Sequence, residues 1–131
     1  MEGYDLIGDI HGHARELQQL LKQLHYTRND GGVYTHPEGR RVIFCGDLID
    51  RGPQAREVLQ IVRSMVDNGS ALIVMGNHEY NMICYHTWID GHFLRPHTAK
   101  NAGHISATLR SFVNYREEWL DYIEWFKTIP L

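Results

Sequence analysis

Three short apolar segments, each followed by a glycine and then by polar side chains, constrain the fold of this chain more than any other feature. They are residues 4–7, 42–45 and 71–75. Each has the length of a β-strand, and the third is apolar throughout, which is typical of a strand buried on both faces of a parallel sheet. The sequence therefore predicts three strands that run into polar loops.

Helical patterns separate these segments. Apolar side chains recur at helical spacing in residues 17–24 and, after Pro53, in residues 58–66, where Asn68 and Gly69 end the pattern. The alternation of strand and helix predicts an α/β fold with a layered sheet. Residues 85–103 show no clear period and are predicted to form a loop, whereas helical spacing returns from about residue 105 onward.

Size and composition are those of an ordinary globular protein. With 131 residues and no linker rich in Pro, Gly or Ser, we expect one domain over residues 1–131. The net charge of −3 and the scattered Lys and Arg residues argue against a nucleic-acid surface. The sequence shows no signal-peptide pattern and no apolar run of membrane-spanning length, so we expect no membrane contact and a cytoplasmic location. Cys45 and Cys84 are expected to be buried free thiols.

Potential metal ligands follow each predicted strand. Asp9 and His11 follow the first, Asp47 follows the second, and Asn77 follows the third. Because the crevice beyond the carboxyl ends of the strands binds ligands in open α/β sheets, these side chains are expected to converge. A set of carboxylate, imidazole and amide groups suits a divalent cation such as manganese, iron or zinc.

The polar loops also form three recognisable blocks, residues 8–12 (GDIHG), 46–52 (GDLIDRG) and 76–79 (GNHE). In order and spacing they resemble the signature blocks of the phosphoprotein-phosphatase branch of the calcineurin-like metallophosphoesterases, which includes bacterial serine/threonine phosphatases and diadenosine tetraphosphatases. The resemblance implies an α-β-β-α sandwich with two divalent metal ions. Manganese is the expected metal, with iron or zinc as alternatives.

The resemblance also implies which residues bind the metal ions. Asp9 and His11 would bind the first ion, and Asp47 would bridge both, because two neighbouring dications need an anion between them. Asn77 would bind the second ion and lie against the substrate. A hydroxide held by the metal ions would attack phosphorus.

Three further roles are implied for the second and third blocks. His78 would be the general acid that protonates the leaving oxygen, with Asp50 orienting it. Arg51 would clamp phosphate oxygens with its planar fork of donors.

Only part of the family pattern is present. Two further histidines and a further arginine come from a later half of the family's domain, and nothing after Glu79 matches them. The resemblance therefore implies an amino-terminal half in which one metal ion, not two, binds tightly. Sheet surface left uncovered would favour self-association.

Three functions remain open at this point. The first is a metal-dependent phosphatase acting on a phosphomonoester, either phosphoserine or phosphothreonine in a protein or a small molecule. The second is a hydrolase of dinucleoside polyphosphates such as diadenosine tetraphosphate. The third, from another class, is a truncated metal-binding module without turnover. In all three cases we expect this chain by itself to be weakly active or inactive.

Other residues are assigned less specific roles. Glu79 is expected to make a supporting hydrogen bond or to stabilise a helix N-terminus instead of binding metal. The aromatic stripe around Tyr122 is expected to pack against the core. Arg95 is a minor candidate for substrate binding, and Arg40 and Arg41 are expected to reach solvent. Four histidines are expected to be solvated: His86, His92, His97 and His104.

Overall fold

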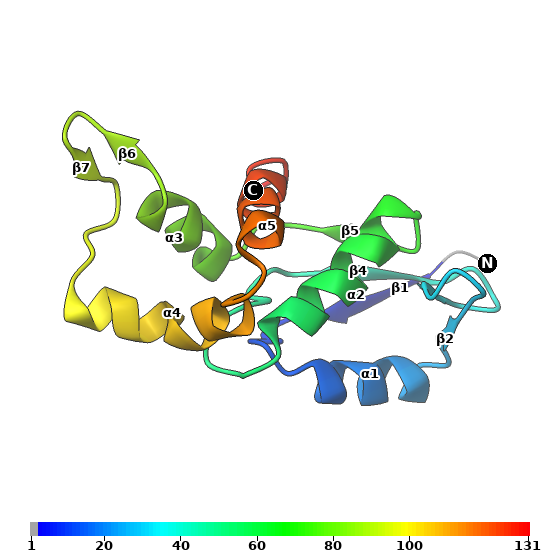
Figure 1. Cartoon of the computed structure of the whole chain (residues 1–131). Helices are drawn as coiled ribbons and strands as arrows, with labels where there is room; N and C mark the ends of the chain where they lie inside the picture. Colours follow the sequence, from blue (N-terminus) through cyan, green and yellow to red (C-terminus); the bar gives the residue numbers. More distant parts are fainter. Residues whose placement is uncertain (1–2) are drawn as a thin grey trace.

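The computed structural model describes residues 3–131 and contains the predicted parallel sheet. Its strands are β1 (Tyr4–Ile7), β4 (Arg41–Phe44) and β5 (Ala71–Ile73), paired in the order β1-β4-β5 (Figure 1). All three end beside one another, which confirms that the polar loops after them share one edge of the sheet.

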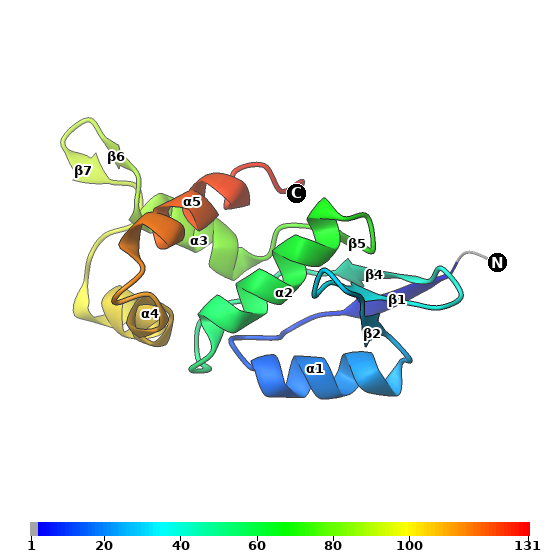
Figure 2. The same ribbon diagram turned by 45° about the vertical axis from the view of Figure 1, so that its right-hand side comes forward.

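Helices cover one face of this sheet. Helix α1 (Ala14–Gln23) connects β1 to β4, and α2 (Ala55–Asp67) connects β4 to β5. Two right-handed crossovers that move in the same direction place both helices on the same side (Figure 2). The buried side chains of this layer form the main core, which includes Ile7, Leu21, Val42, Phe44, Val58, Leu59, Val62, Met65 and Ile73.

The opposite face of the sheet is exposed, which contradicts the prediction that the third strand is buried on both faces. Leu6 is 71% exposed, Leu72 45% and Val74 38%. A continuous apolar run is typical of a strand that is covered on both faces, but within residues 3–131 no element packs against the second face. Cys45, which comes after the buried Phe44, is exposed, so the prediction of a buried thiol is wrong there; Cys84 is only half-buried.

A small hairpin lies at the far end of the sheet. Strands β2 (Thr27–Arg28) and β3 (Tyr34–Thr35) are joined by the predicted glycine-rich loop, in which the Asn29 side chain accepts two backbone N–H bonds. Arg40 does not simply reach solvent as predicted: its guanidinium pairs with the Asp5 carboxylate at 2.9 Å. Partial burial of the Asp5 carboxylate, which belongs to β1, makes this pairing favourable, because a charge removed from water needs a partner.

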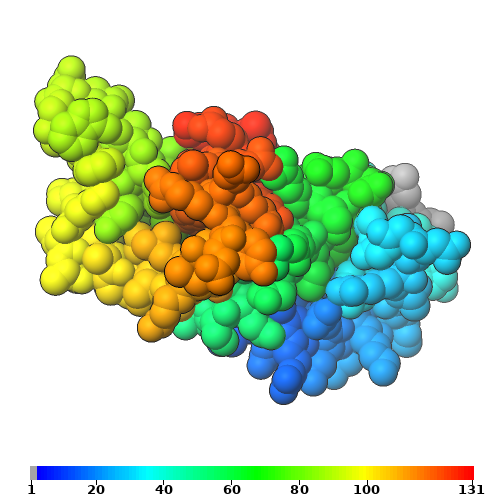
Figure 3. All heavy atoms as spheres, viewed as in Figure 1, coloured from blue at the N-terminus to red at the C-terminus, as the bar shows by residue number. Residues whose placement is uncertain are grey.

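The segment predicted as a loop, residues 85–103, is more regular than expected. After α3 (Asn77–Tyr85), a hairpin of β6 (Trp88–Ile89) and β7 (His92–Phe93) projects from the molecule, and α4 (Ala99–Ser111) begins within the segment (Figure 3). Asp90 and Gly91 both have positive φ, as a two-residue hairpin turn requires. The Asp-Gly sequence is a typical hairpin turn, but the segment was predicted to be a loop because it shows no clear hydrophobic period.

Helix α5 (Arg116–Phe126) packs beside α3 and buries Trp119, Tyr122 and Trp125, which confirms the aromatic stripe as core. His86 is drawn into this interface instead of being solvated as predicted. Its Nδ1 donates to the Met82 carbonyl at 2.9 Å, and its Nε2 accepts the Trp119 indole N–H at 3.2 Å. Burial accordingly lowers the pKa of His86.

The remaining three histidines of that set are exposed, although His97 stacks between Tyr85 and Phe93. Within residues 3–131, no helix has the length and apolar character needed to cross a membrane.

Candidate functional site

Close backbone contacts tie the three polar loops together. A Cβ atom on Gly46 would lie 2.2 Å from the backbone nitrogen of Gly76, and one on Gly52 would lie 2.4 Å from the His11 carbonyl oxygen. The His11 N–H also donates to the Asp47 carbonyl at 3.0 Å. The glycines of the three blocks are therefore needed because the backbones of the blocks touch.

The same loops hold an unusual share of left-handed backbone. Positive φ is uncommon for residues other than glycine and often marks functional sites. Most of the non-glycine residues with positive φ in the described chain belong to the first two blocks: Asp9 (53°), His11 (43°), Asp47 (54°), Asp50 (71°) and Arg51 (73°). The contacts between loops keep these residues in conformations that would otherwise be disfavoured.

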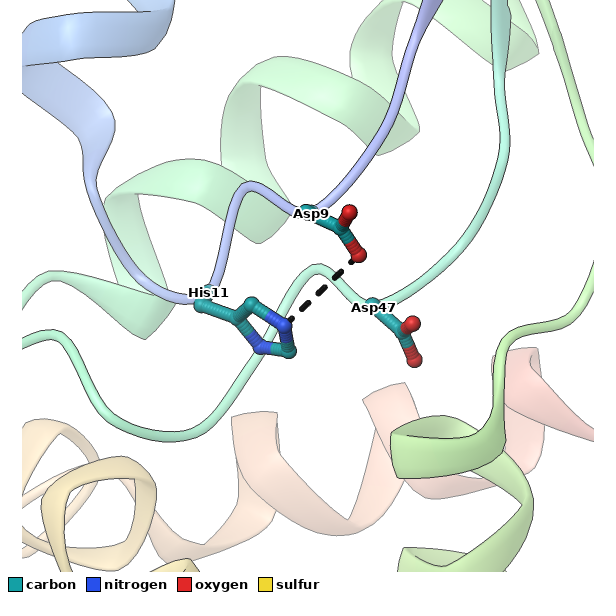
Figure 4. Close-up of side chains that lie close together, drawn as sticks. All are labelled: Asp9, His11 and Asp47. Atoms are coloured by element: carbon teal, nitrogen blue, oxygen red, sulfur yellow. Dashed lines mark ion pairs between the residues drawn. The ribbon is translucent and has the colours of Figure 1, made fainter.

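Asp9, His11 and Asp47 form a cluster that could hold a metal ion. One ligand atom from each lies within 4.8 Å of the other two, and His11 Nε2 is 3.9 Å from Asp9 Oδ1 (Figure 4). Tetrahedral ligands of a divalent ion at about 2.1 Å are about 3.4 Å apart, so a small rotation of the 83% exposed Asp9 side chain would close the set. Two carboxylates and an imidazole fit a divalent cation.

The tautomer of His11 suits a metal ligand. Its Nδ1 lies 2.9 Å from the Ile49 carbonyl oxygen, which can only accept, so Nδ1 carries the proton. Nε2, directed towards Asp9, is then free to donate its lone pair. A backbone or carboxylate acceptor behind the ring is the usual support of a metal-binding histidine.

Glu79 makes supporting hydrogen bonds behind the site, as predicted, and its carboxylate is not one of the three clustered ligands. It is fully buried, and its carboxylate accepts the N–H groups of Asp47 at 2.7 Å and Leu48 at 2.9 Å. Desolvation raises the pKa of this buried carboxyl, while the backbone hydrogen bonds oppose that rise. Glu79 thus fixes the second loop to the start of α3.

His78 and Asp50 form a directly bonded pair. His78 Nδ1 lies 2.7 Å from Asp50 Oδ2, and the backbone N–H of His78 donates to Asp47 Oδ1 at 3.1 Å. The rings of His11 and His78 meet edge to face with centroids 4.7 Å apart. The structure therefore brings the imidazole predicted as an acid next to the predicted metal ligands.

The sequence did not reveal Thr108 as part of this arrangement. Its hydroxyl, fully buried, donates to Asp50 Oδ1 at 2.7 Å and accepts the Asp50 N–H at 2.8 Å. Thr108 lies on α4, beyond the three blocks, and no local motif marks it. The available sequence signal was a single threonine at the helical spacing of the apolar residues of α4.

Arg51 and Asn77 lie on the rim of the site and are exposed. Together with His78 they line a cavity of about 590 Å³ that opens between the second loop, α3 and α4. Asn77 is the first residue of α3 and is not among the three clustered ligands.

The sequence of this chain matches the family described as calcineurin-like phosphoesterase over residues 4–131. Among curated proteins, it is similar to bis(5'-nucleosyl)-tetraphosphatase PrpE [asymmetrical] from Geobacillus sp. strain WCH70, with 49% identity over 74 residues, covering 56% of this chain and 30% of the relative.

Proteins with the same name from other bacteria are similar to the same extent. The identity is 50% over 76 residues for Anoxybacillus flavithermus and 45% over 75 residues for Bacillus subtilis, each match covering 57% of this chain and 30% of the relative. The matched segment thus accounts for less than a third of each relative's length.

Among solved structures, the chain resembles a cold-active protein tyrosine phosphatase. Its superposition on a mutant of that enzyme has a TM-score of 0.54 at 19% identity, covering 86% of this chain and 33% of the other. A second structure of the enzyme gives 0.54 at 20% identity, covering 86% and 32%. At this level of identity, the likeness concerns the fold alone.

Proposed function

Because the chain belongs to the calcineurin-like phosphoesterase family, we propose that the protein hydrolyses a phosphoanhydride bond of a dinucleoside polyphosphate with the help of divalent metal ions. The observation that carries this proposal is that the candidate metal ligands lie next to the His78–Asp50 pair, the proposed general acid and its partner. The ring of His11, in the metal-binding cluster, lies 4.7 Å from the ring of His78, which is bonded to Asp50.

The residue roles in this proposal are those that the family resemblance implies. Asp9, His11 and Asp47 would hold the first metal ion, and Asp47 and Asn77 would contribute to a second; manganese is the metal we propose. Bound metal ions would supply an acidified water and offset charge on the phosphoryl oxygens. No described residue adds a histidine to the second position, so the second ion has fewer ligands here.

His78 is the general acid in this proposal. Its Nδ1–H is held by Asp50, which leaves Nε2 as the atom that can give a proton to the leaving oxygen. Asp50, 2.7 Å away, fixes the orientation of the ring. Arg51, on the cavity wall next to His78, binds phosphate oxygens of the substrate.

The names of the relatives favour the polyphosphate over the phosphomonoester, which the sequence motifs alone had put first. Similar curated proteins are called bis(5'-nucleosyl)-tetraphosphatases, and the sequence blocks themselves do not separate the two substrate classes. The proposal therefore takes the phosphoanhydride as substrate and keeps the monoester as the competing case.

A comparison of two substrates tests this function. With manganese present, kcat/KM for diadenosine tetraphosphate should exceed that for p-nitrophenyl phosphate by at least about 100-fold, a difference of roughly 2.7 kcal/mol in transition-state binding. An asymmetrical cleavage should release one mononucleotide and one nucleoside triphosphate. A higher kcat/KM for p-nitrophenyl phosphate would instead support the phosphatase.

The role of His78 is tested in any form of the protein that turns over substrate. His78→Asn should lower kcat by roughly 10²–10⁴-fold, as loss of a general acid does, without changing metal content. Arg51→Ala should raise KM as well. Loss of metal in His78→Asn would contradict the assignment of His78 as acid, and full metal content with no turnover in the unmodified protein would point to a binding module.

A further inference from the structure

The cavity beside the metal-binding cluster is larger and more basic than a single phosphoryl group requires. It measures about 590 Å³, within the usual size of a small-molecule site. Three arginines line it: Arg51 from the second block, Arg95 from the segment after β7, and Arg110 from the last turn of α4. No Asp or Glu is among its lining residues.

These arginines differ from the arginines that form ion pairs elsewhere in the molecule. Arg40, Arg56 and Arg63 each pair with a carboxylate at 3.1 Å or less. In the part of the chain that the structure describes, no ion pair is made by Arg51, Arg95 or Arg110. Because guanidinium groups that share a cavity repel one another, their grouping without a carboxylate favours an anionic ligand.

Hydrogen bonds fix the segments that carry the two arginines outside the blocks. Arg95 donates to the Asn101 side chain at 3.1 Å, and Asn101 in turn donates to the Pro96 carbonyl at 2.8 Å. The end of α4 that carries Arg110 is tied to the residue that follows the second block, because the Ser111 hydroxyl donates to the Pro53 carbonyl at 3.0 Å. Arg110 and Arg51 also line a second, smaller hollow together.

We infer that this cavity, the α4 pocket, binds the phosphoryl groups that neighbour the one under attack, with Arg95 and Arg110 as their ligands. The inference rests on the proposed function and makes it more specific, because it explains why a chain of several phosphates is preferred to a monoester. The metal cluster and Arg51 would bind the phosphoryl group under attack. Two more guanidinium groups beyond it match further phosphates, which bind bidentate arginines well.

Binding of inorganic tripolyphosphate to the metal-free 131-residue chain tests the α4 pocket without any need for turnover. Isothermal titration should show that Arg95→Ala and Arg110→Ala each weaken tripolyphosphate binding about 10-fold, the usual effect of losing a charge-assisted hydrogen bond. Binding of inorganic orthophosphate, measured in parallel, should change less than about 3-fold.

Arg116→Ala provides the matched control, because it removes one exposed arginine from the first turn of α5, away from the pocket, and should leave both ligands' affinities unchanged. Arg110→Gln, which removes the charge but keeps a polar side chain that favours helix, guards against a folding defect in Arg110→Ala, and circular dichroism checks both.

Two results would overturn the inference: unchanged tripolyphosphate binding in both pocket variants, or an equal loss of orthophosphate and tripolyphosphate binding, which would indicate a site for one anion. Failure of the proposed function would show differently, as a higher kcat/KM for p-nitrophenyl phosphate than for diadenosine tetraphosphate in a protein that still binds tripolyphosphate in the α4 pocket.

Discussion

Asp50 is held on both of its carboxylate oxygens, one by His78 and the other by Thr108. The backbone N–H of Asp50 is bonded to the same threonine hydroxyl. Since the φ of Asp50 is 71°, the residue occupies a conformation that needs such support. Thr108 therefore acts as a positioning residue for the imidazole, although it does not touch it.

Replacing Thr108 by valine keeps the shape of the side chain and removes both hydrogen bonds. We expect a loss of roughly 1–3 kcal/mol in stability, because the buried Asp50 N–H is left without a partner. In a form of the protein with turnover, kcat should fall about 10-fold with little change in KM, since His78 is misaligned.

The proton resonance of His78 Nδ1, measured by nuclear magnetic resonance, should also move in Thr108→Val. Thr108→Ser retains the hydroxyl and should restore both the resonance and kcat. A threonine that only packs would give a stable variant with an unaltered imidazole signal, and that outcome would contradict the positioning role.

At the scale of single residues, the sequence predicted that Asp9, His11 and Asp47 converge, and the structure places them together. Asp9 and His11 follow β1 and Asp47 follows β4, so parallel pairing of the two strands brings their loops side by side. The contact of Asp50 with Thr108 joins residues 58 apart in the chain. No periodicity or motif could predict that contact, because it arises from where α4 docks.

The loops of the site depend on glycine as a structural element. Ala at position 46 would place a Cβ atom 2.2 Å from the Gly76 nitrogen, in a residue whose φ is 79°. Gly46→Ala should therefore lower the free energy of unfolding by roughly 3 kcal/mol or more and weaken metal binding, because the second and third blocks must separate.

Gly69→Ala is the matched control for that change. Gly69 has a φ of 81°, but a Cβ atom there meets nothing within 4 Å. It should cost only about 1–2 kcal/mol from backbone strain and leave metal affinity intact. Equal losses in the two variants, measured by denaturant unfolding, would show that the contact between blocks contributes nothing.

The Asp5 carboxylate connects β1 to two neighbouring elements and should make stability depend on pH. The hydrogen bond from Arg40 lowers the pKa of Asp5 below its ordinary 3.8. Burial of the carboxylate opposes this effect, and a hydrogen bond from the Tyr26 hydroxyl at 2.7 Å adds to it. Because the folded-state pKa is the lower one, this contribution is present above about pH 4 and is lost as the pH falls through the folded value.

Asp5→Asn should therefore melt about 3–5 °C below the unmodified chain at pH 7, and the difference should shrink as the pH drops below 3.8. Thermal melting followed by circular dichroism at several pH values measures it. A difference that stays constant down to pH 3 would mean that the ionised carboxylate is not the source.

At the scale of elements, hydrophobic period predicted the three strands, α1 and α2, because each buries one apolar stripe or run against the core. The hairpin of β6 and β7 escaped prediction since its strands have two residues each and leave Trp88 60% exposed. The exposure of Cys45 and Leu72 could not be predicted from their segments, because only the surroundings of a sheet decide whether its second face is covered.

For the whole molecule, the number of available ligands limits metal binding. We expect calorimetric titration with manganese to show about one tight site per chain, because the second position has only the shared Asp47 and the neutral Asn77. Turnover of this chain should be very low for the same reason. Asp9→Asn and Asp47→Asn should each abolish the tight site.

Asp90→Asn, which alters an aspartate of similar backbone conformation in the β6–β7 turn, is the control and should bind manganese normally. Two tight equivalents per chain with rapid turnover would overturn this prediction.

The exposed face of the sheet should make the chain self-associate, as Leu6, Leu72 and Val74 present apolar surface and both edge strands are open within the described residues. Light scattering should show a species larger than a monomer, and Leu72→Lys should shift it towards the monomer. Leu120→Lys, at 42% exposure on α5 compared with 45% for Leu72, should not. A monomer in all three proteins would contradict the prediction.

The cluster of Asp9, His11 and Asp47 draws its members from the loops after β1 and β4, two strands that pair although α1, β2 and β3 lie between them in the chain. An unfolded chain thus offers no comparable set of ligands, so an ion that binds the cluster stabilises the pairing of β1 with β4. Amide hydrogens of Leu6 and Phe44 should consequently exchange with solvent more slowly as manganese is added, by a factor that follows the occupancy of the ion. The rate of exchange would then report the affinity of the ion without any measurement of catalysis.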